Sequence, residues 1–129
     1  MREGEITALD SYTALTTLCG DAVSSAIPVP PGMSRVSMIT TSSSQDGSTA
    51  SACSFTVKLT GTGIADTQYF SVGASTNVGT ETSDGTTSPA NVKMVNIPVK
   101  QNGNISVFGG VCGSADPGTA HMAVELLFE

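Results

Sequence analysis

The residue types that most often bind metals or act as bases are scarce in this chain. Its 129 residues include a single histidine, His121, and three cysteines, Cys19, Cys53 and Cys112. A zinc site within one chain needs more nitrogen or thiolate ligands than one histidine supplies. We therefore expect His121 to face solvent or a neighbouring molecule, and we assign no metal-binding residue.

Hydrolytic chemistry lacks its usual motifs. Serines are abundant, but the sequence contains no Gly-x-Ser-x-Gly, and His121 is the only histidine that could serve as the base. Glycoside cleavage needs two carboxylates that flank one bond, and no such pair can be named. We expect the protein not to be an enzyme and assign no catalytic residue.

Calcium and phosphate sites are disfavoured for the same reason. Asp46 and Asp84 lie in polar stretches without the alternating oxygen ligands of a calcium loop, and Asp66 precedes a predicted strand. The Gly61-Thr-Gly63 and Gly109-Gly110 segments lack the Gly-Lys-Ser/Thr ending of a phosphate loop. We expect turns or bulges at these positions, and no cofactor.

Composition and charge limit the partners. Net charge is −6, and only 12% of residues are charged, against about a quarter in a typical domain. The basic residues are scattered singly, so no stripe exists to follow a phosphate backbone, and we expect no direct nucleic-acid binding. A polar but weakly charged surface favours close contact with other copies or an extracellular setting.

The sequence shows neither a membrane span nor a signal peptide. No apolar run approaches the length that crosses a bilayer. The first residues, Met-Arg-Glu-Gly-Glu, have acid where a signal peptide is basic, so we expect synthesis in the cytoplasm. The odd number of cysteines argues against a complete disulfide framework, and whether Cys19 and Cys112 pair is left open.

Two segments alternate clearly between apolar and polar residues, as a strand with one buried face does. In residues 119–129, Ala120, Met122, Val124, Leu126 and Phe128 are predicted to face inward, and His121, Ala123, Glu125 and Leu127 outward. In residues 53–60, Cys53, Phe55, Val57 and Leu59 are predicted to face inward, and Lys58 outward.

Further strands are predicted at 35–41, 68–74, 92–99 and 105–111, joined by polar loops at 42–51 and 75–90. Pro98 indicates an edge or a bulge, and Asn102-Gly103 predicts a hairpin. Residues 1–26 are interpreted as an arm or edge strand, with a short helix as the alternative, and 27–33 as a proline-rich lead-in. The predicted fold class is all-β, and residues 27–129 are expected to form a single antiparallel β-sandwich, of jelly-roll or immunoglobulin-like topology.

The order of these turns carries a resemblance. Pro28-Val-Pro-Pro-Gly-Met-Ser-Arg-Val36 precedes an early strand, Ile97-Pro-Val99 and Ile105-Ser-Val107 flank the Asn-Gly pair, and Asp116-Pro-Gly-Thr-Ala120 opens the last strand. This arrangement resembles the single jelly-roll capsid proteins of tailless icosahedral viruses of bacteria and archaea. The resemblance implies a homo-oligomeric subunit, such as a trimer or ring, that is located in the virion and assembles with other capsid proteins.

The expected function is therefore a non-enzymatic structural protein: a major, minor or decoration subunit of a viral capsid. Residues 1–26 and the 75–90 loop are expected to contact neighbouring subunits. One alternative is a module that binds carbohydrate or a cell surface through the polar loops at one end of the sandwich, and Tyr12, Tyr69 and a few polar loops are the candidates for a sugar-binding face. Another alternative is a subunit of an extracellular filament.

Overall fold

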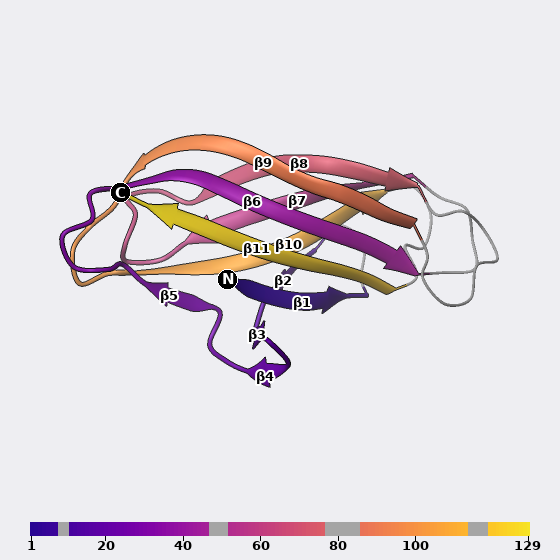
Figure 1. Ribbon diagram of the computed structural model, residues 1–129, viewed down its shortest axis with the longest axis horizontal. Coiled ribbons are helices and arrows are strands. Elements are labelled where there is room, and N and C mark those ends of the chain that lie inside the picture. Colours follow the sequence, from indigo (N-terminus) through magenta and orange to yellow (C-terminus); the bar gives the residue numbers. More distant parts are fainter. Residues whose placement is uncertain (8–10, 47–51, 77–85, 114–118) are drawn as a thin grey trace.

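The computed structural model describes residues 1–7, 11–46, 52–76, 86–113 and 119–129. Within these ranges the chain forms strands and no helix, and the strands make two antiparallel sheets packed against each other (Figure 1). The prediction of an all-β sandwich is confirmed.

Six strands form the first sheet: β1 (Arg2–Ile6), β3 (Thr17–Leu18), β4 (Asp21–Ala22), β6 (Arg35–Asp46), β9 (Thr86–Pro98) and β11 (Thr119–Phe128). Their order is β4-β3-β1-β11-β6-β9. The second sheet contains β2 (Tyr12–Ala14), β7 (Ala52–Thr60), β8 (Gln68–Thr76) and β10 (Asn104–Gly113), in the order β2-β10-β7-β8. The short β5 (Ala26–Pro28) also pairs with β10.

Eight of these strands pair in a nested pattern. β1 pairs with β11, β2 with β10, β6 with β9 and β7 with β8, all antiparallel. Leaving aside β3, β4 and β5, these pairs join the first strand to the last, the second to the second-last, and so on inward. The pairs β11–β6 and β10–β7 complete the two sheets. The chain therefore follows one long antiparallel ribbon folded over on itself.

The predicted alternation is confirmed wherever side chains are described. On β7, Phe55, Val57 and Leu59 are fully buried, and on β11 Met122 and Val124 are buried. These side chains belong to one core between the sheets, which also contains Ile6, Leu15, Val29, Val36, Ile39, Ile64, Val95, Ile105, Val107 and Val111. The side chains of Cys53 and Ala120 lie outside the described set.

The described part of residues 1–26 is built into the sandwich as strands rather than as a helix. β1 lies between β3 and β11, with Gly4 opposite Met122. Ile6 and Leu15 have no exposed surface. These two side chains bury apolar area in the common core, so this segment contributes to the stability of the sandwich.

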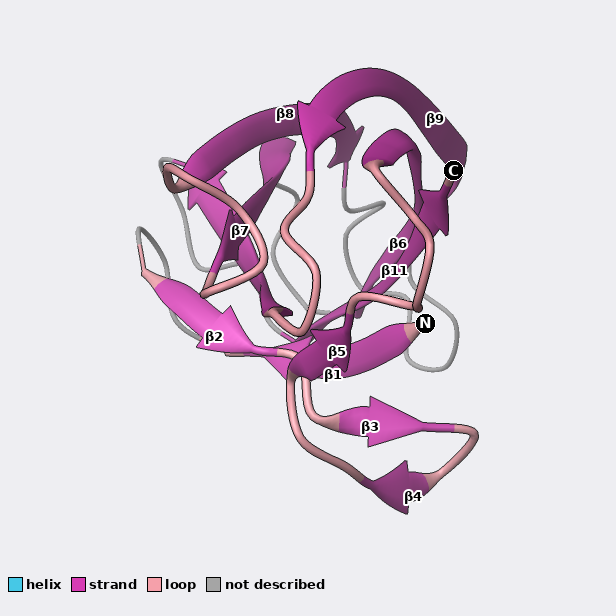
Figure 2. Ribbon diagram, turned by 90° about the vertical axis from the view of Figure 1, so that its left-hand side faces the viewer, coloured by secondary structure: helices cyan, strands magenta, loops and turns pink. Residues whose placement is uncertain are grey.

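The β3–β4 hairpin belongs to the first sheet, although β2 and β5, which precede and follow it in the chain, pair with β10 of the second sheet. β2 and β5 cover the same edge of β10, and Leu15 and Ser25 bridge them by hydrogen bonds to Val107 (3.0 and 3.2 Å). Residues 16–24 between them project from the sandwich (Figure 2). Cys19 and Gly20 form the tip with φ of 51° and 88°, as a two-residue type I′ hairpin requires.

The hairpin predicted at Asn102-Gly103 is wrong. β9 and β10, which flank it, belong to different sheets. The Gly103 N–H donates to the Lys100 carbonyl at 3.3 Å, and Asn102 has a φ of 60°. A Cβ on Gly103 would overlap the backbone of Gly63, so the glycine allows this turn to pack on the β7–β8 connection.

The prediction of a loop over 42–51 is also wrong for residues 42–46. β6 continues to Asp46, with Ser42 and Ser44 opposite Ala123 and His121 of β11. In the same way β8 reaches Thr76 and β9 begins at Thr86, while residues 77–85 of the predicted 75–90 loop lie outside the described residues. β9 is the edge strand of the first sheet and shows register shifts against β6. The edge or bulge expected from Pro98 is therefore confirmed.

Candidate functional site

Aromatic side chains gather on the outer face of the β2-β10-β7-β8 sheet. Two rows of opposed residues cross its four strands; one row is Ala14, Phe108, Lys58 and Tyr69, and the next is Tyr12, Gly110, Thr56 and Ser71. The chain has six aromatic residues in all, and three of them lie in these rows. We call Tyr12, Lys58, Tyr69 and Phe108 the tyrosine patch.

The two tyrosines of the patch are in ring contact. Their centroids are 5.7 Å apart and their planes are inclined by 52°, a tilted geometry that aromatic pairs favour. Tyr12 is 38% exposed and Tyr69 61% exposed. Large apolar groups left open to water in this way are more informative about function than buried ones.

Lys58 places a cation among the rings. Its Nζ lies 4.9 Å from the centroid of Phe108 and 5.6 Å from that of Tyr12. Both distances are within the range of a cation–π attraction. The half-buried lysine therefore adds a hydrogen-bond donor and a positive charge to an otherwise apolar surface.

Gly110 makes room for this arrangement. A Cβ at Gly110 would lie 2.9 Å from the Thr56 Oγ1 and 3.1 Å from two ring carbons of Tyr12. The Tyr12 ring can therefore lie across β10 only because Gly110 has no side chain. The Thr56 Oγ1 is buried without a hydrogen-bond partner in the described structure, at a cost of about 1–3 kcal/mol.

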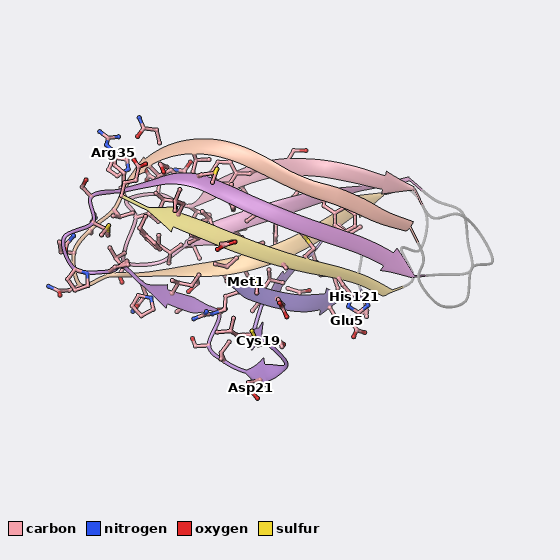
Figure 3. All side chains as sticks on the ribbon, in the orientation of Figure 1. Met1, Glu5, Cys19, Asp21, Arg35 and His121 are labelled. Atoms are coloured by element: carbon pink, nitrogen blue, oxygen red, sulfur yellow. The ribbon has the colours of Figure 1, made fainter. Side chains whose placement is uncertain are left out.

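The outer face of β1 and β11 has the opposite charge. Glu3 lies opposite Ala123 and Glu5 opposite His121, and Glu5 and His121 are seen side by side in Figure 3. Leu127 is 46% exposed on the same face of β11. The predicted outward parity of β11 is confirmed. We call Glu3, Glu5, Glu125 and Leu127 the acidic face.

The remaining sequence candidates do not come together. Cys19 is a free, exposed thiol at the hairpin tip (Figure 3), so it is not paired with Cys112. Asp66 is exposed in the β7–β8 connection, and Asp84 lies outside the described residues. In the part of the chain that the structure describes, no three His, Cys, Asp or Glu side chains are grouped to hold a metal ion. In the same ranges no helix has the length and hydropathy of a membrane span.

The side chains of the tyrosine patch can bind another surface in two ways. Tyr12, Tyr69 and Phe108 offer ring faces, which stack on apolar or sugar surfaces, and Lys58 offers one charged donor. A scan against protein-family models, a search of curated proteins and a search of solved structures each found no match to this chain.

Proposed function

We propose that this protein is a non-enzymatic structural subunit, a β-sandwich of jelly-roll type that self-associates into a symmetric assembly such as a viral capsid. The observation that carries the proposal is the nested pairing of β1 with β11, β2 with β10, β6 with β9 and β7 with β8. A jelly roll has eight strands in two sheets. The eight nested strands of this chain, divided equally between its two sheets, support that topology.

A rigid end of the sandwich supports a role as a building block. Gly63 is tied by backbone hydrogen bonds to Asn104 and Lys100 (2.9 and 2.8 Å), and Val29 is tied to Gly103 (2.9 Å). The Gln101 side chain joins Gly32 and Met33. Loops fixed in this way present a constant shape, which a repeated contact in a symmetric assembly requires.

Electron microscopy of the purified protein tests the proposal. Closed rings, shells or other particles of regular size are expected at concentrations where copies associate. Fields of separate single molecules at every concentration would contradict it.

A carbohydrate-binding module is the second candidate, because Tyr12 and Tyr69 form an exposed aromatic pair next to a lysine. Such a module would be monomeric, and a sugar would stabilise it in proportion to RT ln(1 + [L]/Kd). A glycan array separates the two candidates: hits that disappear in Tyr69→Ala would favour the module, and a blank array would leave the structural role.

A further inference from the structure

The exposed large apolar side chains are divided between the two outer faces of the sandwich. In the described residues they are Met1, Tyr12, Tyr69 and Leu127. Tyr12 and Tyr69 belong to the tyrosine patch. Leu127 belongs to the acidic face. Met1 follows the alternation of Glu5 and Glu3, so it lies on the same outer face, near Glu125. Each face therefore offers apolar area that a contact would remove from water.

The same two faces are complementary in charge. Glu3 and Glu5 on β1 and Glu125 on β11 make one face negative. The Arg2 guanidinium, which donates to the carbonyls of Ser24, Ala26 and Met1 (2.6, 2.9 and 2.8 Å), keeps its positive charge, but the three carboxylates of β1 and β11 outnumber it. On the opposite sheet the outward residues that the structure describes include Lys58 and no carboxylate.

We propose that the acidic face of one copy packs against the tyrosine patch of a second copy, with Lys58 meeting Glu125 and Leu127 covering the tyrosine rings. This inference rests on the proposed self-assembly and names its contact. Buried aromatic side chains are common centres of binding energy, and charge complementarity sets the orientation of the two copies. A second copy of this chain carries both surfaces, so the two complementary faces are always present together in the same solution.

The geometry of this contact determines the kind of assembly. The two surfaces differ and lie on opposite sheets, so each copy uses its acidic face for one neighbour and its tyrosine patch for another. Such a heterologous contact repeats from copy to copy. It closes into a ring when the rotation per copy divides a full turn, and otherwise continues as a filament.

Variants that reverse the charge of Lys58 and of Glu125, singly and together, test the contact. Their self-association is measured by sedimentation velocity of the full chain over a range of concentrations. Lys58→Glu and Glu125→Lys should each raise the dissociation constant of the assembly at least about tenfold, because each places like charges together. The double variant should regain most of the wild-type affinity. Lys100→Glu, at an exposed turn lysine, is the matched control and should change little.

A second variant covers the case in which a charge change disturbs folding. Tyr69 is the most exposed member of the patch, so Tyr69→Ala should lower the melting temperature by only a few degrees, through the loss of its ring contact with Tyr12, and still weaken assembly. Assembly that is unchanged by Lys58→Glu, Glu125→Lys and Tyr69→Ala would overturn this contact and leave self-assembly standing. A monomeric wild type would overturn both, and glycan binding that needs Lys58 and Tyr69 would assign the patch to sugar instead.

Discussion

The rings of Tyr12 and Tyr69 touch across a sheet although two strands, β10 and β7, separate their own strands. At the usual strand spacing their backbones are about 14 Å apart, while the ring centroids are 5.7 Å apart. Both side chains therefore reach towards each other across the sheet, and the Tyr12 ring lies over Gly110. The rings and Lys58 together make an aromatic cluster on this outer face.

Gly110→Val should break this ring contact. The new side chain would meet the Tyr12 ring and the Thr56 Oγ1 at the close distances found for a Cβ. We expect a loss of tyrosine near-UV circular dichroism and a fall in unfolding free energy of about 1–3 kcal/mol. Ser71→Val, in the same row and exposed, is the control and should stay within about 0.5 kcal/mol of the wild type. An unchanged tyrosine signal in Gly110→Val would contradict this account of the patch.

Cys19→Asn should stabilise the protein. Cys19 has a φ of 51° at the hairpin tip, a conformation that asparagine tolerates better than most residues. We expect a gain of about 0.5–1 kcal/mol in chemical denaturation under reducing conditions. Cys19→Val, which is branched at Cβ, should instead destabilise. The reverse order of the two variants would show that the tip is not left-handed.

Leu127→Glu and Val124→Glu should have opposite consequences. Leu127 is 46% exposed and Val124 fully buried. Leu127→Glu should keep the melting temperature within a few degrees but weaken self-association, because a carboxylate replaces the apolar side chain that is proposed to cover the tyrosine rings. Val124→Glu should unfold the domain, because it buries a carboxylate without a partner. Circular dichroism melts report the folding of each variant, and sedimentation velocity reports its self-association. Equal losses of folding would mean that the parity of β11 is wrong.

Gln101→Ala should loosen one end of the sandwich. The Gln101 side chain accepts a hydrogen bond from the Gly32 N–H at 3.2 Å and donates to the Met33 carbonyl. Loss of both bonds should lower the unfolding free energy by about 1–2 kcal/mol and speed amide exchange at Gly32. Gln68→Ala, which removes one local 3.4 Å bond to Asp66, is the control. Equal effects of the two changes would contradict the role given to Gln101.

Long strands with one buried face were predictable from the sequence. Apolar and polar residues alternate along β7 and β11, which have nine and ten residues, so the sequence alone predicts which side chains face inward and which face outward. The alternation also places Lys58 outward. It would have placed Phe108 outward as well, because that residue lies between the buried Val107 and Gly109.

The short strands and the sheet assignments were not predictable in the same way. β3 and β4 have two residues each, too few for a period, and no turn was predicted at Cys19-Gly20. The Asn102-Gly103 pair suggested a hairpin because local turn chemistry does not reveal whether the next strand joins the same sheet. Tyr12 and Tyr69 were considered together with polar loops as parts of a sugar-binding face, without a prediction that their rings touch. Their contact depends on Gly110, where a turn or bulge was predicted but β10 continues without a register shift against β7.

Self-association of the sandwich can be measured by size-exclusion chromatography with light scattering over a wide range of protein concentrations. We expect a molar mass of several times the 13.0 kDa chain, fixed for a ring and rising with concentration for a filament, that falls when Tyr69 is replaced by alanine. A monodisperse mass of one chain at the highest concentration would contradict self-association.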